Sequence, residues 1–256
     1  MKRFFAIHKL FLLFFVQACS AFLSAQTAQL KEAETAYTQE AYEKAIETYE
    51  QVLKSNGASA EVYYNLGNAY YKTNQLAAAI LNYERALLQV PNDADTRFNL
   101  EMAKQRTVDK IEPLDTFFLT KWCLSVQNLA SVDAWAYVAV VCFLLAIIGI
   151  TFYFFSKRLL FKKAGFFLSV FFLICVVVAN IFASRQEAKM MDRSGAIVFA
   201  ATVTVKSSPD DSGTDLFVLH EGTKVNIKST LGEWSEIILE DGNQGWMPTK
   251  TIETIN

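Results

Sequence analysis

Two uncharged apolar runs with a short basic segment between them limit what this chain can fold into. Residues 134–155 and 164–183 contain no Asp, Glu, Lys or Arg. A helix rises about 1.5 Å per residue, so about 20 such residues cross a hydrocarbon core of about 30 Å. The segment between the runs, 156–163, contains Lys157, Arg158, Lys162 and Lys163. The pattern predicts a transmembrane helical hairpin. The alternative, two buried core helices of a soluble protein, does not explain the basic segment.

The same basic segment predicts the orientation of the hairpin. Lys and Arg are enriched in short cytoplasmic loops, so residues 156–163 are expected on the cytoplasmic side of the membrane. The regions before residue 134 and after residue 183 are then both expected on the opposite side.

Residues 1–25 have the layout of a secretory signal peptide, with a short basic start followed by an apolar run. Our preferred cleavage point follows Ala25. Two alternatives stay open: Cys19, which ends the sequence VQAC, becomes a lipid-modified N-terminus, or the leader is retained as an anchor. All three send the next region across the membrane, in agreement with the orientation from the basic segment.

The composition excludes several classes of protein. The net charge is −2, and Lys and Arg cluster only in the leader and the hairpin segment, so nucleic-acid binding is not expected. One cysteine lies in the leader and two lie in the apolar runs, so no disulfide framework is implied. The four are Cys19, Cys123, Cys142 and Cys175. Cys and His show no metal-ligand spacing, and neither a metal nor a cofactor is expected.

Internal repetition is the second organising feature, in the region before the hairpin. Residues 60–93 place the small residues Gly67 and Ala79 where two helices cross closely, and Pro91 where the second helix ends. The full set of repeat-defining positions is Tyr63, Leu66, Gly67, Tyr70, Ala79, Tyr83, Ala86 and Pro91. This set resembles the tetratricopeptide repeat, which implies paired helices that bind other proteins.

A shift by one repeat length, about 34 residues, extends the pattern in both directions. Residues 26–59 form a weaker repeat, in which Ala45 matches Ala79. Residues 94–110 resemble a first helix without a partner, with charges at packing positions, as in a capping helix. The region 26–111 is therefore expected to form five helices. Two repeats are few for a free-standing array, so we expect its stability to need the cap, a partner or self-association.

The inner groove of such arrays is lined by the first helix of each repeat. In this register the lining residues are Leu30, Glu34, Tyr37, Glu61, Tyr64, Asn68, Tyr71, Phe98 and Met102. One interpretation is a protein-binding groove of mixed aromatic and polar character, and the other is that several of these side chains pack against the adjacent helix. Relatives that clamp a C-terminal carboxylate place basic residues where Asp95 and Asn99 stand here, so that ligand class is not expected.

Residues 112–133 connect the repeats to the hairpin and mix large apolar side chains with polar ones. Pro113 is expected to end the capping helix. The segment fits an amphipathic helix at the membrane surface with Trp122 in the interface, or a linker helix packed on the repeats. We interpret Cys123 as a small buried hydrophobe rather than a redox-active or lipid-linked thiol.

After the second apolar run and a polar helical extension, the pattern changes to short strands. Residues 194–256 are rich in Val, Ile and Thr, with Gly, Asp and Asn between the runs, and Asp241-Gly242 is a hairpin turn signal. The strand Val203-Thr204-Val205, the turn 219–223, Gly232-Glu233-Trp234 and Gly245-Trp246 resemble the bacterial SH3-like domain. The resemblance implies a small all-β barrel.

Trp234 and Trp246 are the candidate ligand residues of this domain. They line a shallow groove for a peptide or a cell-wall stem peptide, or they fill a barrel of about 60 residues, which has few ways to fill its centre. We expect one of them in the core and the other partly exposed. His220 has no Cys or Ser partner in a recognisable motif, so we interpret it as structural.

The complete order is leader, repeats, connector, hairpin and SH3-like domain. The predicted fold is a multidomain membrane protein with an all-α repeat region, a two-helix transmembrane hairpin and an all-β barrel. This architecture resembles the repeat-containing BatE type of the Bacteroides aerotolerance operon family. The resemblance implies a partner role beside membrane proteins with von Willebrand factor A domains and a MoxR-type ATPase, in envelope maintenance or stress tolerance.

Three classes of function remain open from the sequence. Our preferred hypothesis is a membrane-anchored scaffold that presents two protein-binding modules in the periplasm. The second is an envelope sensor or anchor whose SH3-like domain binds peptidoglycan. The third, an enzyme, is not expected, because the chain shows no paired-carboxylate cleft, Gly-rich phosphate loop or nucleophile–base pair.

Overall fold

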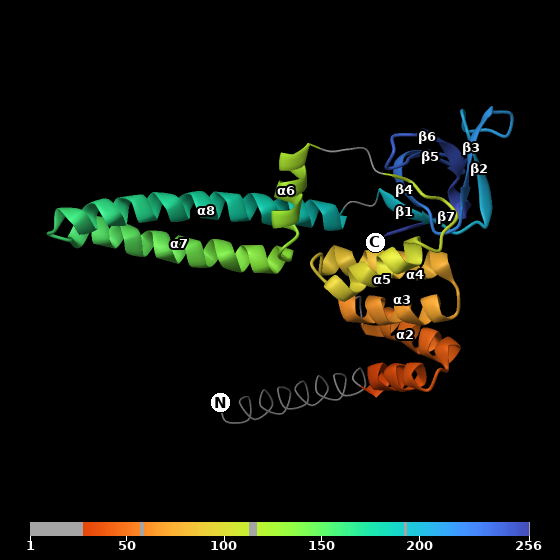
Figure 1. Ribbon diagram of the computed structural model, residues 1–256, viewed down its shortest axis with the longest axis horizontal. Coiled ribbons are helices and arrows are strands. Elements are labelled where there is room, and N and C mark those ends of the chain that lie inside the picture. Colours follow the sequence, from red (N-terminus) through yellow and green to blue (C-terminus); the bar gives the residue numbers. More distant parts are fainter. Residues whose placement is uncertain (1–27, 57–58, 113–116, 192–193, 256) are drawn as a thin grey trace, which may run out of the picture.

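The computed structural model describes residues 28–56, 59–112, 117–191 and 194–255. A long helical hairpin projects from a body in which a stack of short helices lies against a small sheet (Figure 1). The expected signal peptide with its cleavage point and Cys19 lies outside the described residues, as does Pro113.

Within the described residues, five helices make up the stack. They are residues 28–38, α2 (Tyr42–Asn56), α3 (Ala60–Lys72), α4 (Leu76–Gln89) and α5 (Ala94–Lys104). Ser59 caps α3 by accepting a hydrogen bond from the Val62 amide, and Asp93 caps α5 in the same way. The turns inside the two repeats are equivalent, since Glu40 and Asn74 adopt the left-handed backbone conformation with φ of 61° and 63°.

The crossing inside the second repeat depends on the absence of a side chain at Gly67. A Cβ there would lie 2.7 Å from the Tyr83 ring and 3.3 Å from the carbonyl oxygen of Ala79. In the first repeat, Ala45 and Tyr49 are 0% and 1% exposed. The small and aromatic positions found in the sequence are therefore the ones that pack the helix pairs.

The capping helix is shorter than the expected span 94–110. α5 ends at Lys104, and the Lys110 ammonium group turns back to donate to three carbonyl oxygens. These belong to Lys104, Gln105 and Thr107, at 2.9, 2.9 and 2.7 Å. The carbonyl groups at the end of a helix have no amide donor within the helix, and here the Lys110 ammonium group acts as a donor. The chain then leaves the stack and runs to the sheet.

The projecting hairpin consists of α7 (Val132–Phe155) and α8 (Leu159–Met191). Residues 156–158 lie between the helices, so the second half of the expected loop 156–163 is the start of α8, which also continues past residue 183. Both helices are long and apolar enough to cross a membrane, and only 17% and 11% of their most apolar stretches are buried within the molecule. The alternative of buried core helices is therefore wrong.

The two hairpin helices touch along small residues. A Cβ on Gly165 would lie 2.6 Å from the carbonyl oxygen of Gly149, and one on Gly149 would lie 2.9 Å from that of Gly165. Ala139, Ala146 and Ala179 are also buried in the hairpin. Small residues let two backbones approach closely, which is the packing that membrane helices use in place of hydrophobic burial.

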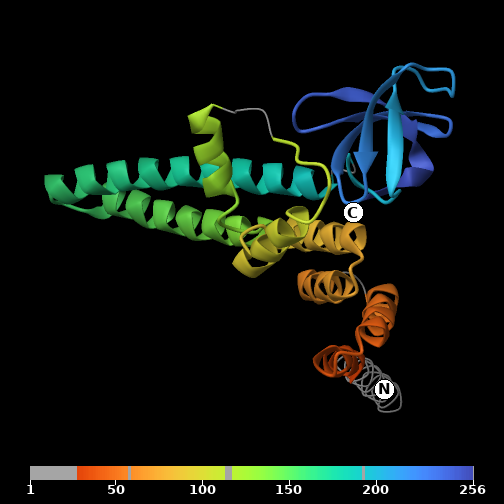
Figure 2. The same cartoon turned by 45° about the vertical axis from the view of Figure 1, so that its right-hand side comes forward.

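α6 (Phe118–Gln127) runs across the base of the hairpin, the end where α7 starts, rather than along it (Figures 1 and 2). Gln127 Nε2 donates to Gln186 Oε1 of α8 at 3.0 Å, and the Trp135 indole of α7 donates to the Gln127 carbonyl oxygen at 2.9 Å. These bonds hold one end of α6 against both hairpin helices. The alternative of a linker helix packed on the repeats is wrong, because the large apolar side chains of α6 are exposed.

The C-terminal region is one antiparallel sheet of seven strands. They are β1 (Gly195–Val198), β2 (Thr202–Lys206), β3 (Asp215–His220), β4 (Lys224–Leu231), β5 (Trp234–Ile238), β6 (Gln244–Pro248) and β7 (Ile252–Thr254), with a 3-10 turn at Thr249–Thr251 before β7. Their order is β3-β2-β6-β5-β4-β1-β7, and the described pairings leave β3 and β7 at the edges. The sheet is strongly curled (Figure 2) and encloses an apolar core, which is compatible with the expected barrel.

The core of the sheet is aliphatic and contains neither tryptophan. Its buried members are Ala196, Val198, Val203, Val205, Leu219, Val225, Ile237, Leu239 and Met247. Side chains alternate between the two faces of a strand, so the inward positions of Ile237 and Met247 turn Trp234 and Trp246 outward. The expectation that one tryptophan fills the core is therefore wrong.

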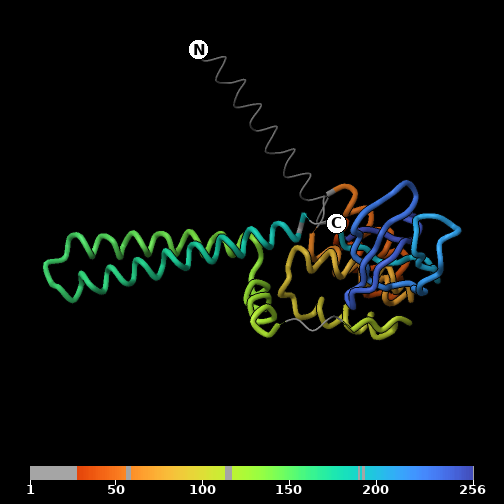
Figure 3. Tube along the Cα trace, turned by 90° about the horizontal axis from the view of Figure 1, so that it is seen from above, coloured from red at the N-terminus to blue at the C-terminus, as the bar shows by residue number. Residues whose placement is uncertain are grey.

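The sheet packs directly on the last two helices of the stack. Ile197 of β1 and Ile255 share one buried core with Ile80 of α4 and with Leu100 and Ala103 of α5. The sheet thus covers the end of the two-repeat array and provides stabilisation that we expected only from a cap, a partner or self-association. Repeats and sheet lie at the same end of the hairpin, opposite the 156–158 turn (Figure 3).

Candidate functional site

The expected groove residues divide into exposed and half-buried side chains. Exposed are Glu34, Glu61, Phe98 and Met102, and half-buried are Leu30, Tyr37, Tyr64, Asn68 and Tyr71. Leu30 and Tyr37 pack against the buried core of the first repeat. Tyr64 and Tyr71 of α3 pack against the core that α4 and α5 share with the sheet. The set therefore contains packing residues on the first helix and on α3, and its exposed members on α3 and α5 are Glu61, Phe98 and Met102.

A polar network joins α3, α4 and α5 beside these surface residues. Asn68 Oδ1 accepts hydrogen bonds from the Tyr83 hydroxyl and from Asn99 Nδ2, both at 2.8 Å. Asn99 Nδ2 also donates to the Tyr64 hydroxyl oxygen at 3.2 Å. Burial raises the pKa of Tyr83, so its hydroxyl remains a donor. Sequence reasoning missed the role of Asn99, because this contact joins helices of different repeats.

α5 presents an apolar pair next to the network. Phe98 and Met102 lie one helical turn apart, and their exposed fractions are 66% and 39%. The Arg106 guanidinium carbon lies 5.0 Å from the centre of the Tyr71 ring, and its NH2 group donates to Asn74 Oδ1. This part of the expected groove, which we call the α3–α5 groove, therefore combines exposed apolar area with fixed hydroxyl, amide and guanidinium groups, as protein-binding surfaces do.

The contact between repeats and sheet has a hydrogen-bonded edge at Asp109. Asp109 Oδ2 accepts from the His220 amide and from the Thr223 hydroxyl, both at 2.7 Å, and Asp109 Oδ1 lies 2.9 Å from His220 Nδ1. Burial tends to raise the pKa of Asp109, but the hydrogen bonds from Thr223 and His220 outweigh it and hold that pKa below its ordinary value. His220 therefore joins the sheet to the chain that follows α5.

Glu84 of α4 is the charged centre of the same contact. Its side chain is 11% exposed and pairs with Lys224 of β4 at 2.7 Å and with Lys104 of α5 at 3.2 Å. Burial tends to raise the pKa of Glu84, but the two ammonium groups outweigh it and hold that pKa below its ordinary value. Arg85 adds an ion pair to Glu253 at 3.1 Å. These pairs bind the repeats and the sheet into one body.

Trp234 and Trp246 lie together on the outer face of the sheet and are both partly exposed. Trp234 stands opposite Pro248, and Trp246 stands opposite Glu236 on the same pair of strands. The tryptophans are therefore diagonal neighbours on one face. Leu231 of β4 pairs with Trp234 and is 60% exposed. These side chains form a shallow apolar surface, which we call the tryptophan surface.

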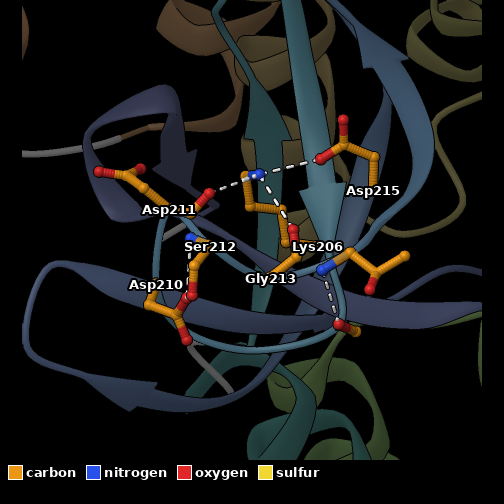
Figure 4. Close-up of polar contacts among 8 residues, drawn as sticks. Lys206, Asp210, Asp211, Ser212, Gly213 and Asp215 are labelled. Atoms are coloured by element: carbon orange, nitrogen blue, oxygen red, sulfur yellow. Dashed lines mark hydrogen bonds and ion pairs between the residues drawn. The ribbon is translucent and has the colours of Figure 1, made fainter.

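One turn of the sheet gathers several aspartates around a lysine (Figure 4). Lys206 Nζ donates to Asp215 Oδ1 at 2.9 Å and to the carbonyl oxygens of Asp211 and Gly213 at 3.1 and 3.2 Å. Its side chain is 19% exposed. The ammonium group occupies the position between oxygens that a bound cation would need, so the turn is organised by the chain's own lysine.

The remaining reactive groups do not assemble into a site within the described part of the chain. No group of three or more His, Cys, Asp or Glu side chains there is placed to hold a metal ion. Cys123, Cys142 and Cys175 are free thiols of intermediate exposure. Cys123 is thus half-buried on α6 and not the buried hydrophobe that the sequence suggested. The α3–α5 groove and the tryptophan surface are the features that suit recognition.

Comparison with known protein families identifies the N-terminal helices. Residues 34–74 match the family described as TPR repeat, and residues 60–93 match the family described as Tetratricopeptide repeat. The second match covers the same residues as the stronger repeat in the sequence. No curated protein matches the chain. The N-terminal region therefore contains TPR repeats, which are protein–protein interaction modules.

Proposed function

We propose that the protein is a non-enzymatic, membrane-anchored scaffold whose α3–α5 groove binds another protein. The observation that carries the proposal is the exposure of Phe98 and Met102 beside the hydrogen-bonded pair Asn68 and Asn99. Binding energy in protein interfaces concentrates in apolar anchors surrounded by polar groups with fixed geometry. A TPR module that offers such a surface is suited to a protein partner.

The hairpin serves as the anchor in this proposal. The outward side chains of its two uncharged runs, 134–155 and 164–183, are mostly apolar, which is unfavourable in water and favourable in a bilayer. The repeats and the sheet lie at one end, and the turn with Lys157 and Arg158 lies at the other. The tendency of basic loops to stay in the cytoplasm then puts both modules in the periplasm, at a bacterial inner membrane.

The identity of the partner rests on the resemblance to the BatE type of the Bacteroides aerotolerance operon family. That resemblance implies membrane proteins with von Willebrand factor A domains and a role in envelope maintenance or stress tolerance. The structure adds a physical reason for a partner in the same membrane. Because the sheet and the repeats form one body above the hairpin, the groove is held near the bilayer surface.

The proposal is tested by purifying the full-length protein with its partners from native membranes and identifying them by mass spectrometry. Phe98→Asp places a charge in the groove, and Leu216→Asp makes the same change at an exposed position of β3 (49% exposed). We expect membrane proteins with von Willebrand factor A domains to be recovered with the wild type and with Leu216→Asp, and to be lost with Phe98→Asp. Recovery of the same partners with both variants overturns the groove as the binding surface.

A second candidate function, an envelope sensor or anchor that binds peptidoglycan, is favoured by the tryptophan surface. The SH3-like resemblance implies a ligand on this domain, and the partly exposed Trp234 and Trp246 lie with the exposed Leu231 on its outer face. Co-sedimentation of the full-length protein with cell-wall sacculi tests it. Binding that is lost in Trp246→Ala and kept in Phe98→Asp supports this function, and absence of binding by the wild type rejects it.

A further inference from the structure

The connector helix α6 and the residue before it expose large apolar side chains, while the Gln127 end of the helix is bonded to the hairpin. The exposed fractions are 65% for Phe117, 67% for Phe118, 50% for Leu119, 64% for Trp122 and 46% for Leu124. Soluble surfaces rarely collect apolar side chains of this size on one short element, and such patches mark contact with another molecule or with a membrane.

The apolar side chains of α6 gather mainly on one side of the helix. At 3.6 residues per turn, Phe118, Trp122 and Val126 fall on one face together with Leu119. The other side carries the polar residues Thr120 and Lys121, and Ser125 lies at the boundary next to Phe118. Gln127 is turned toward the hairpin, where it bonds to Gln186. The helix is therefore amphipathic, apart from Leu124 among its polar residues.

The contact with Gln186 sets the level of α6 relative to the apolar spans. Gln186 follows Ala183, the end of the second apolar run, by three residues, or about 4.5 Å of helix. The interfacial region outside the hydrocarbon core is about 5–7 Å thick on each side. The Trp135 indole, near the start of α7, holds the Gln127 backbone at the same level. The end of α6 therefore lies where a bilayer changes from acyl chains to headgroups.

The direction of α6 fits the same position. The helix runs across the hairpin in both side views (Figures 1 and 2). A hairpin that stands along the membrane normal therefore lays α6 in the plane of the membrane, with no change in the contacts at Gln127.

We propose that α6 binds the lipid surface directly. The helix lies in the interfacial region of the leaflet that faces the repeats and the sheet, with Phe118 and Trp122 among the upper acyl chains and Lys121 toward the headgroups. The inference rests on the membrane anchor proposed above. It adds a second lipid contact, which fixes the height and the tilt of the α3–α5 groove relative to the bilayer.

Trp122 provides the test in the full-length protein reconstituted into vesicles of phosphatidylethanolamine and phosphatidylglycerol. The difference between the emission of the wild type and of Trp122→Phe isolates Trp122, and the same subtraction with Trp246→Phe isolates a tryptophan of the sheet. We expect lipids brominated near the headgroup to quench most of the Trp122 emission and lipids brominated near the chain ends to quench less. The Trp246 emission should respond to aqueous acrylamide and not to brominated lipid.

Two outcomes overturn the proposal. Quenching of Trp122 by acrylamide and not by brominated lipid means that α6 faces water. Protection of Trp122 from both quenchers means that protein, a second copy or a partner, covers the helix. Extraction of the same vesicles with alkaline carbonate separates the two levels of the account. If the chain is extracted, the membrane anchor itself is wrong, and if it is retained while Trp122 faces water, only the role of α6 is wrong.

Discussion

The two long-range contacts that hold this protein together are built in different ways. α7 and α8 meet at backbone distance along Gly149 and Gly165, with small side chains on either side. The repeats and the sheet meet around an apolar centre at Ile197, with a buried carboxylate at Glu84 and a hydrogen-bonded one at Asp109. The contact between α7 and α8 depends on close packing of small residues. The contact between the repeats and the sheet combines apolar burial with charged groups.

The difference is explained if the first contact forms in lipid and the second forms in water. In lipid, apolar side chains gain nothing by leaving the solvent, so helices associate through close van der Waals contact. In water, apolar burial drives association, and charged groups at the contact select one arrangement over others. The construction of the two contacts thus supports an anchor in lipid and a two-module body in water.

The largest expected effect is at the hairpin crossing. Gly165→Leu places a side chain where a Cβ alone would lie 2.6 Å from a backbone oxygen, which cannot move aside. We expect a loss of about 3 kcal/mol in the free energy of unfolding, measured by denaturation in detergent micelles. Ala164→Leu places the same side chain on the exposed neighbour and should cost less than about 0.5 kcal/mol. If the two substitutions lowered the free energy of unfolding equally, α7 and α8 would not be in close contact at Gly165.

A smaller effect is expected at the centre of the contact between repeats and sheet. Glu84→Ala leaves Lys104 and Lys224, which are 34% and 28% exposed, without their carboxylate. We expect a loss of about 2 kcal/mol, measured by thermal unfolding of the full-length protein. The matched control is Glu32→Ala, whose pair with Lys44 is exposed and should contribute about 0.5 kcal/mol or less. A larger loss of stability in Glu32→Ala than in Glu84→Ala would show that Glu84 is not the main charged group of this contact.

Acidification should weaken the contact between repeats and sheet and leave the hairpin crossing unchanged. The pKa values of Glu84 and Asp109 are lowered in the folded protein. Carboxyls of this kind stabilise the contact above their ordinary pKa of about 4, and the stabilisation is lost as the pH falls through the lower folded pKa. Amide exchange in β3 and β4 should therefore increase relative to α7 at low pH.

Asp109→Asn gives the matching control for this pH dependence. The amide cannot ionise, so acidification should loosen β3 near His220 less in this variant than in the wild type, starting from a weaker contact at neutral pH. Exchange that rises equally in α7 and β3 would mean that acid unfolds the whole molecule and does not act at the contact.

The smallest effect is expected in the groove. Phe98 is 66% exposed and takes no part in either long-range contact, so Phe98→Asp should change the free energy of unfolding by no more than about 0.5 kcal/mol. Thermal unfolding of the variant beside the wild type measures this. A clear loss of stability would show that Phe98 packs in the folded protein, and the loss of a partner in this variant would then not locate the binding surface.

The elements that repeat or run long were predictable from the sequence. The apolar runs found in the sequence lie within two long helices, and Gly67 and Tyr83 meet at the helix crossing because the repeat pattern encodes that packing. Local signals were weaker guides to where elements end. The expected capping helix stops at Lys104, and the Lys110 side chain donates to the carbonyl of Lys104 and to two carbonyls that follow the helix.

Contacts between distant segments were not predictable. Nothing near Asp109 in the sequence indicates that it binds His220, because no local pattern encodes a pairing between segments separated by the helical hairpin. The side of the sheet that each tryptophan occupies was also open, since strand alternation fixes which residues share a face but not which face is buried. The role of Asn99 was also not predictable, because its hydrogen bond to Asn68 joins helices of different repeats.

The central claim, a membrane-anchored scaffold with a partner in the α3–α5 groove, is tested most directly by site-specific photocrosslinking in native membranes. A photoreactive residue replaces Phe98 in the groove or, as a control, Lys54 on α2, whose side chain is 79% exposed. The account predicts one abundant adduct from position 98, containing the partner that Phe98→Asp loses, and none from position 54. No adduct from either position, or the same adducts from both, would contradict it.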